Sequence, residues 1–244
     1  MEIFVAGRFI KTSRELKVTN PYNGQLVATT FLAGQPELEM SISAAQAAIK
    51  SMQNLPSFKR YEILMHISNR LTERREEFGR LLMLESGKPI RYALGEIDRS
   101  IQTFTVAAEE SKRLPKEYLS LDWTPAGEKK EGLVKYFPVG IVAGIAPFNF
   151  PLNLAVHKIA PAIAAGCPII LKPSSVTPLS TLLLAQIISE TGLPEGSVSI
   201  LPMDRSTGNS LVTDPRIALL SFTGSPEVGW KMKREAGKKK VVLE

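Results

Sequence analysis

The sequence predicts an α/β protein: a Rossmann-like parallel sheet with helices on both faces, an N-terminal helical layer and a protruding β-hairpin. From residue 138 onward, short apolar stretches alternate with helix-forming ones, the order typical of a parallel sheet. Before them, apolar side chains recur at helical spacing, and two strand-like stretches around a polar centre separate the two parts. We therefore expect N-terminal strands and a helical layer over 1–114, the hairpin over 115–137 and a dinucleotide-binding α/β core over 138–244.

The N-terminal 30 residues are expected to form strands. Phe4-Val5 and Phe9-Ile10 flank Ala6-Gly7, which is typical of a hairpin break. Asn20–Gly24 is a turn cluster, and a strand-like stretch, 26–30, follows it.

Three helices are expected between residues 36 and 112. Pro36 suits a first helical position, and acidic residues follow it. Ser57 is a candidate cap for the second helix, which we expect to run unbroken to Gly87, with Pro89 just beyond. The apolar residues of this second helix share one face: Ile63, Leu64, Ile67, Leu71, Phe78, Leu81 and Leu82. The third helix starts at Pro89 and carries the stripe Ile90, Ala93, Ile97, Ile101 and Phe104.

The hairpin and the core follow from the remaining pattern. Residues 118–121 and 133–137 are strand-like and flank a polar segment with Pro125 and Gly127. Beyond them, strands are expected at 140–146, 168–171, 198–201, 217–222 and 240–244, and helices near 151–165, 178–191, 205–212 and 226–236. Pro161 is expected to kink or split the first of these helices. The alternation implies right-handed crossovers in a parallel sheet.

Composition indicates an ordinary globular protein. The 244 residues are 44% hydrophobic and 22% charged, which excludes a disordered chain. A single cysteine allows no intramolecular disulfide and fits a reducing compartment, so we expect a cytoplasmic location. We see no signal peptide, and Pro, Gly, Lys or Ser interrupts each apolar run well before membrane-spanning length.

The net charge of +6 comes in good part from Lys and Arg residues between 231 and 240. The alternatives are an attraction for phosphate or nucleic acid and a solvated helix face. No nucleic-acid-binding motif accompanies the charge, so the solvated face is favoured and no nucleic-acid or membrane partner is expected.

Three residue groups at expected strand ends are candidates for binding or catalysis. Thr223-Gly224-Ser225 precedes a helix, whose free amides favour an anion; a turn with a helix cap explains it equally well. Lys172 lies where a ligand meets an open α/β sheet, or is a surface lysine. Asn149 offers two amide donors for an oxyanion, or caps the following helix. On local grounds both alternatives stay open for each group.

The remaining reactive residues favour structural roles. Cys167 has no basic partner near it in sequence and is expected to be buried and inert. His66 and His157 lack metal-ligand spacing, so no metal site is expected. The sequence holds no Gly-x-Gly-x-x-Gly fingerprint, no P-loop and no recognisable Ser-His-Asp arrangement.

Read together, several blocks resemble the aldehyde dehydrogenase superfamily over essentially the whole chain. The blocks are Phe4–Phe9, Asn20-Pro21, Glu85–Pro89, Pro147–Pro151, Lys172–Ser175, Phe222–Ser225 and Leu243-Glu244. Residues 148–158 look most like the branch that holds lactaldehyde and non-phosphorylating glyceraldehyde-3-phosphate dehydrogenases. The resemblance implies that a cysteine thiolate attacks an aldehyde, hydride passes to NAD or NADP, and water hydrolyses the thioester.

The resemblance also implies roles for individual residues. Asn149 matches the oxyanion-hole side chain, Glu244 the general base and Lys158 a lysine often assigned to proton relay. The cofactor-binding positions are Ala146, Pro147, Phe148, Lys172, Ser174, Ser175, Gly208, Gly224, Ser225 and Val228. Phe150 and His157 match the substrate tunnel, and a polar His157 indicates a small hydroxylated or anionic aldehyde. The protruding hairpin matches the oligomerisation element, which implies a homo-oligomer.

Two departures from the family pattern change what we expect. Ser175 stands where NAD-preferring members often carry Glu, so repulsion of a 2′-phosphate is absent and NADP is permitted beside NAD. The family's nucleophilic cysteine lies downstream of Glu244, where this sequence ends, and Cys167 belongs to another motif. We expect these residues alone to bind a dinucleotide without turnover, and to self-associate through exposed apolar surface. The rival hypotheses are a self-contained, non-catalytic nucleotide-binding module and, more weakly, a nucleic-acid binder using the 231–240 run.

Overall fold

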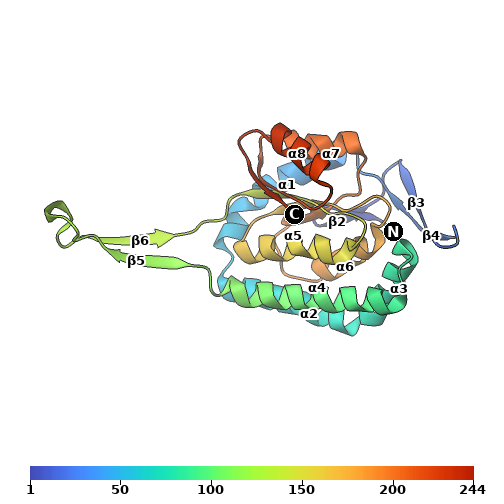
Figure 1. The fold of residues 1–244 in the computed structure, drawn as a ribbon, viewed down its shortest axis with the longest axis horizontal. Coiled ribbons are helices and arrows are strands. Elements are labelled where there is room, and N and C mark those ends of the chain that lie inside the picture. The colour runs from blue at the N-terminus through green and yellow to red at the C-terminus, as the bar shows by residue number, and fades with distance from the viewer.

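A central seven-stranded sheet organises the molecule, which a computed structural model describes from Met1 to Glu244 (Figure 1). Its strand order is β11-β10-β7-β8-β9-β1-β2. The five strands from β7 to β11 are parallel, and β1 and β2 extend one edge as an antiparallel hairpin. The bounds are β1 Ile3–Val5, β2 Arg8–Ile10, β7 Ile141–Ile145, β8 Ile169–Lys172, β9 Val198–Ile200, β10 Ile217–Phe222 and β11 Lys240–Leu243. The α/β class and the strand-helix alternation are confirmed.

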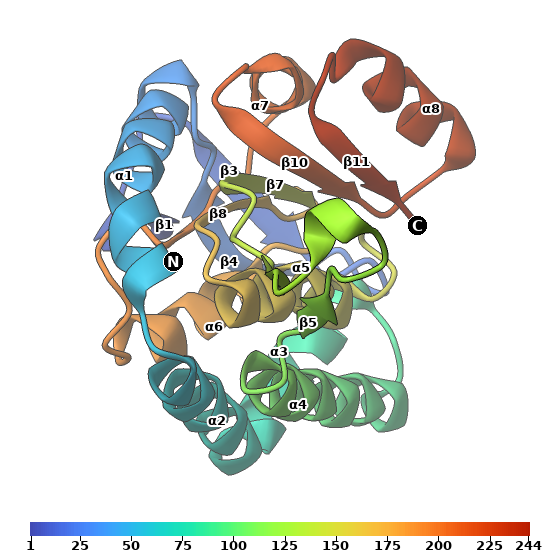
Figure 2. The same ribbon diagram turned by 90° about the vertical axis from the view of Figure 1, so that its left-hand side faces the viewer.

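Helices cover both faces of the sheet (Figure 2). Those after the core strands are α5 Pro151–Ala165, α6 Leu179–Ser189, α7 Arg205–Thr213 and α8 Pro226–Glu235. α5 and α6 lie on one face, and α7, α8 and the N-terminal α1 (Gln35–Asn54) on the other. Consecutive side chains of β7 enter opposite layers: Val142 packs in the core below α5, whereas Ile141 and Ala143 pack in the core below α1 and α7. This two-sided burial explains the nearly continuous apolar composition of β7.

The remaining helices form a second layer beneath α5 and α6, and two expectations about them fail. The apolar stretch from 57 to 87 is two helices, α2 Ser57–Glu73 and α3 Arg75–Ser86, because Arg74 leaves helical geometry (φ −99°, ψ 16°). Ser57 is not a cap, since Pro56 holds the N-cap position. α4 (Ile90–Ser111) then follows Gly87, whose φ of 69° ends α3 as expected.

Pro161 does not split α5, which continues through it to Ala165. Pro161 lies on the exposed side of α5, where water can satisfy the carbonyl that the ring leaves without a partner.

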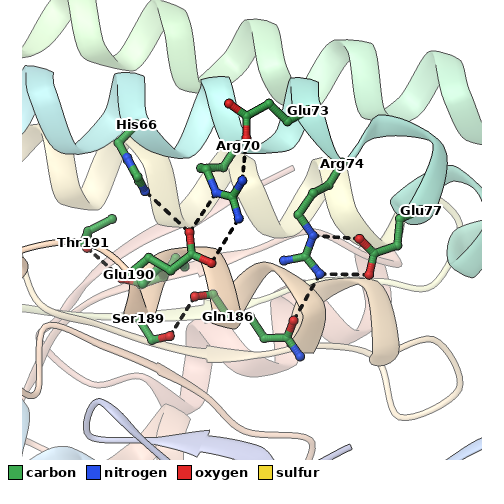
Figure 3. A network of polar contacts seen from close by, with 10 residues as sticks. His66, Arg70, Glu73, Arg74, Glu77, Gln186, Ser189, Glu190 and Thr191 are labelled. Carbon is green, nitrogen blue, oxygen red and sulfur yellow. Dashed lines mark hydrogen bonds and ion pairs between the residues drawn. The ribbon is translucent and has the colours of Figure 1, made fainter.

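An ion-pair network fastens this second layer to α6 (Figure 3). Arg70 of α2 donates from Nε to Glu190 at 2.8 Å and also pairs with Glu73. Arg74 pairs with Glu77 and donates to Gln186 of α6. Single exposed pairs contribute little, about 0–1 kcal/mol each, but several joined pairs fix how the two layers sit on one another.

Two further hairpins flank the sheet. β3 (Glu15–Thr19) pairs with β4 (Leu26–Phe31) across the expected turn at Asn20–Gly24; β3 lies within the N-terminal stretch expected to form strands, although its bounds were not predicted. β5 (Lys116–Ser120) and β6 (Glu131–Lys135) form the expected hairpin, which projects far from the body of the molecule, with a short 3₁₀ turn, η1 (Pro125–Gly127), at its tip (Figure 1). Large apolar side chains stay exposed along it: Tyr118, Trp123, Leu133, Tyr136 and Phe137. None of the helices is both long and apolar enough to cross a membrane.

Candidate active site

The carboxyl ends of the parallel strands bring the candidate residues to one edge of the sheet. Ala146–Phe150 follow β7, Lys172–Ser175 follow β8, Thr223–Ser225 follow β10, and Glu244 follows β11. β7 lies between β8 and β10. The strands that follow it are therefore added first on one side, as β8 and β9, and then on the other side, as β10 and β11. Open α/β sheets bind ligands at such a switch point, and most of the candidate residues surround it.

Lys172 reaches from the end of β8 toward α7. Burial lowers the pKa of its ammonium group, and Asp204 partly offsets this effect. Gly208 of α7 makes room for the side chain, because a Cβ there would lie 2.9 Å from Lys172 Cε. Beside it, Ser175 Oγ donates to the Met203 carbonyl at 3.0 Å, and Ser174 Oγ accepts from Val176 N at 3.4 Å. Both serine oxygens keep lone pairs that remain available to a ligand.

The start of α8 offers unpaired donors. Ser225 is its N-cap, yet the side chain makes no capping bond, and the amides of Glu227 and Val228 have no partner. Gly224 is required for this turn, because a Cβ there would lie 2.4 Å from Cζ of the buried Phe222 ring. A free hydroxyl and free amides at a helix N-terminus are suited to a phosphate group. The turn-with-cap alternative for 223–225 is therefore weakened, since the expected side-chain cap is absent.

Lys158, Thr223 and Glu244 form a continuous hydrogen-bond chain. Lys158 Nζ donates to Thr223 Oγ1 at 2.6 Å, and Thr223 Oγ1 donates to Glu244 Oε2 at 2.8 Å. Lys158 is 3% exposed. Burial lowers the pKa of its ammonium group to about 8, against the attraction of Glu244. The arrangement connects a lysine that titrates near neutral pH to a carboxylate through one hydroxyl.

The lowered Lys158 pKa predicts a specific pH dependence of stability. Since the folded pKa of about 8 lies below the ordinary value of 10.5, the unfolded chain binds the proton more tightly in this interval. The free energy of unfolding should rise with pH between about 8 and 10.5, by at most about 3 kcal/mol. Urea denaturation of the wild type and Lys158→Met across this range measures the difference. If the difference in free energy of unfolding between the wild type and Lys158→Met does not change with pH, the lowered pKa of Lys158 is contradicted.

Asn149 is not a helix cap, so that alternative is wrong. The N-cap of α5 is Phe150, and Glu96 Oε1 of α4 accepts the first-turn amides of Leu152 and Asn153 at 2.9 and 3.1 Å. Asn149 Oδ1 instead accepts from Phe150 N at 3.1 Å. This bond turns the carboxamide so that its NH₂ group, which has no partner, is free to donate.

The two substrate-tunnel candidates lie in different depressions. His157 joins Lys158 and Glu244 in a largely apolar groove of about 580 Å³ between α4, α5 and β11, and its Nε2 lies 3.3 Å from Asn153 Nδ2. Phe150 lies with Asn149 in a neighbouring hollow of about 520 Å³. The guanidinium groups of Arg91 and Arg99 line that hollow, and that of Arg99 lies 6.0 Å from the centre of the Phe150 ring. The structure therefore separates Phe150 from His157.

The other predicted cofactor-binding residues lie at the end of β7 and at the start of α8. Ala146 is buried and its amide donates to the Lys172 carbonyl at 3.1 Å, which joins the ends of β7 and β8. Pro147 and the exposed Phe148 follow it at the same edge, and Val228 is exposed on the first turn of α8. Cys167 is 3% exposed at the opposite end of β8, and burial raises its pKa, as expected of an inert thiol.

Two residues that shape the site, Lys88 and Glu96, had no predicted role, and a third, Thr223, was expected only as part of an anion-binding turn. Thr223 connects Lys158 to Glu244, and Lys88 and Glu96 hold the segment that carries Asn149. Thr223 and Lys88 lie inside quoted blocks, but nothing near Glu96 in sequence indicates that it caps a helix more than 50 residues away.

Comparisons with known proteins agree with this arrangement. A model of the Aldehyde dehydrogenase family matches residues 9–244. The chain is 37% identical over 243 residues to 3-sulfolactaldehyde dehydrogenase of Priestia aryabhattai, covering 99% of this chain and 50% of the relative. It thus spans about half the length of the curated relatives it matches.

Solved structures match over the whole chain. Aldehyde dehydrogenase 21 from Physcomitrella patens, in complex with the reaction product succinate, has a TM-score of 0.97 and 45% identity over 51% of its own length. NADP-dependent glyceraldehyde-3-phosphate dehydrogenase from Bacillus halodurans, complexed with NADP, has a TM-score of 0.95 and 32% identity over 52% of its length.

Proposed function

Because the chain belongs to the aldehyde dehydrogenase family, we propose that it binds NAD or NADP along the carboxyl edge of its sheet and forms one side of an aldehyde-oxidising site. One observation carries this proposal. The residues 223–225 join the unpaired N-terminus of α8 to the Lys158–Thr223–Glu244 chain, so an anion site and a proton-accepting carboxylate adjoin. Residues 138–244 would hold the dinucleotide, with 1–114 as the supporting layer.

The residues present fit a dinucleotide. The free amides and hydroxyl at the start of α8 would hold the diphosphate, and Gly224 lets it approach the backbone. Lys172, Ser174 and Ser175 would meet the adenosine ribose, and Ser175 brings no charge to repel a 2′-phosphate. When bound, the nicotinamide accepts a hydride. The solved relative that carries NADP supports the use of that cofactor.

Three side chains would serve the chemistry at the aldehyde carbon. The free Asn149 NH₂ group would donate to an oxyanion, and Glu244 would take a proton from the hydrolytic water. Lys158 would exchange that proton through Thr223, since its pKa of about 8 permits both protonation states near neutral pH. The Asn149 role rests on its unpaired NH₂ group, and the roles of Glu244 and Lys158 rest on the hydrogen bonds that each makes with Thr223.

The substrate we propose is a small hydroxylated or anionic aldehyde. His157 supplies a polar group in the groove beside Glu244, and Arg91 and Arg99 supply positive charge in the hollow beside Asn149. The names of the similar proteins support this class: one acts on sulfolactaldehyde, one was solved with succinate, and one is a glyceraldehyde-3-phosphate dehydrogenase.

We propose further that these 244 residues alone bind the dinucleotide without turnover, because their single thiol, Cys167, is buried and precedes β8, at the opposite end of that strand from the candidate site. The β5–β6 hairpin would contact a second copy through its exposed aromatic side chains, and the cytoplasm would be the location. NAD(P)H formation above a buffer blank would overturn the first statement. Light scattering that shows a stable monomer would overturn the second and favour a self-contained nucleotide-binding module.

Calorimetric titration tests cofactor binding. We expect saturable binding of NADP or NAD by the wild type, and a loss of about tenfold in affinity for Lys172→Ala, because one partly buried charge-assisted contact disappears. Lys50→Ala, an exposed lysine on α1, is the matched control and should bind as the wild type does. Equal binding by Lys172→Ala would remove Lys172 from the site.

A further inference from the structure

We propose that Lys88 and Glu96 are a positioning pair that sets the direction of the Asn149 carboxamide. This inference rests on the proposed function, because that proposal makes Asn149 the oxyanion donor. Neither residue needs to touch an aldehyde or a dinucleotide for this role, so both are positioning residues.

The pair joins a fully buried carboxylate to a partly buried ammonium group. Lys88 Nζ lies 2.5 Å from Glu96 Oε2, with side-chain exposures of 15% and 0%. A buried ion pair stabilises a fold weakly, since desolvation offsets much of the attraction. Such a pair instead fixes the orientation of the groups around it, because each charged group must also make further hydrogen bonds and few geometries allow all of them.

Glu96 directs its second oxygen at the start of α5. Glu96 Oε1 accepts from Leu152 N at 2.9 Å and from Asn153 N at 3.1 Å, the amides that the first turn of α5 leaves unpaired. The carboxylate also lies where the helix dipole favours negative charge. α4 therefore fixes the place and direction of the α5 N-terminus, and with it the segment that precedes it.

Lys88 directs its other hydrogens at that segment. Its Nζ donates to the Asn149 carbonyl at 2.8 Å and lies 4.7 Å from the centre of the Phe150 ring. One ammonium group thus joins Glu96 to the main chain of Asn149 and to the side chain of the next residue. Gly87, with its left-handed backbone, ends α3 immediately before Lys88.

The held peptide then orients the carboxamide. Asn149 Oδ1 accepts from Phe150 N, which belongs to the same peptide unit as the carbonyl that Lys88 holds. Rotation of this peptide would move the acceptor and the donor together, so the direction of the free NH₂ group depends on the Lys88 contact. Removing Lys88 should release that direction while Glu96 still caps α5.

The test observes the Asn149 side-chain NH₂ resonances by ¹⁵N–¹H spectroscopy, assigned by their loss in Asn149→Asp. In Lys88→Met we expect these resonances to shift or broaden, while slow exchange of the Leu152 and Asn153 amides persists. Lys88→Arg, which keeps a donor, should restore them. Lys59→Met is the matched control, because Lys59 also pairs with a glutamate and lies over a phenylalanine ring, but on the exposed side of α2.

Unchanged Asn149 resonances in folded Lys88→Met would overturn the proposal. If that variant fails to fold, Lys88→Met/Glu96→Gln removes both charges and keeps the capping oxygen, and the same two outcomes apply. Dinucleotide titration of the same variants separates the two proposals. If Lys88→Met still binds the dinucleotide and its Asn149 resonances are unchanged, the positioning pair alone is rejected. If the wild type binds no dinucleotide while the Asn149 resonances shift in Lys88→Met, the proposed cofactor role alone is rejected.

Discussion

Replacing Glu85 by alanine should lower the free energy of unfolding by about 3 kcal/mol at pH 7. Glu85 of α3 is 1% exposed and accepts from Leu179 N at 2.6 Å and Ser180 N at 3.0 Å. The substitution leaves two buried amides at the start of α6 without an acceptor, each at a cost of about 1–3 kcal/mol, and opens a cavity. Urea denaturation measures the loss. Glu62→Ala, which removes an exposed glutamate of α2, should change stability by less than about 0.5 kcal/mol.

The same carboxyl should make stability depend on pH. Burial raises the pKa of Glu85 to about 7, although the amide donors oppose the shift. Because the folded state then holds the proton more tightly than the unfolded chain, the free energy of unfolding falls as pH rises from about 4.5 to about 7. Glu85→Gln keeps an acceptor oxygen and removes the titration, so the wild-type curve should slope downward relative to it. If the pH curves of the wild type and Glu85→Gln are parallel, the pKa of Glu85 is not raised by burial. If Glu85→Ala loses little stability, Glu85 is not the cap of α6.

Replacing Gly224 by valine should lower dinucleotide affinity by about a hundredfold or more, equivalent to ~3 kcal/mol. A Cβ at this position would lie 2.4 Å from Phe222 Cζ, and Phe222 is buried, so the turn must move instead of the ring. That movement displaces the unpaired amides of Glu227 and Val228 from the proposed diphosphate site. Calorimetric titration with NADP and NAD measures the loss.

Two further variants isolate this cause. Gly192→Ala adds a Cβ with nothing within 4 Å and should bind as the wild type does. Phe222→Leu removes the ring atom that Gly224 approaches, so the pair Phe222→Leu/Gly224→Ala should bind better than Gly224→Ala alone. Wild-type affinity in Gly224→Val would show that the start of α8 takes no part in binding.

The periodicity of apolar residues predicted the strands and helices of the core, but it did not predict every helix end or the bounds of every N-terminal strand. β7 and α5 are recognisable because a continuous apolar run ends at Pro147 and a Pro-initiated helix follows. The break at Arg74 was missed because the apolar spacing continues across it and no Gly or Pro marks the position. The bounds of β3 were not predictable, because only Val18 in it is buried and its alternation is weak.

The site divides in a similar way. The strand-end residues Lys172, Ser225 and Glu244 were predictable together, because parallel strands bring their carboxyl ends to one edge. The buried Glu85 and Glu96 were not predictable as caps, since the first amides they accept, those of Leu179 and Leu152, lie 94 and 56 residues further along the chain. Distance in sequence hides such contacts, so they appear only when the helical layer is packed on the sheet.

The central claim is that a dinucleotide binds at the carboxyl edge of the sheet, with its diphosphate at the start of α8. The most direct measurement is mapping of backbone amide resonances during titration with NADP and NAD. We predict saturable shifts at Ser225, Glu227 and Val228 and in the Lys172–Ser175 segment, with none in the distant β5–β6 hairpin. Saturable shifts that leave residues 224–228 unchanged, or no saturable shifts at all, would contradict the account.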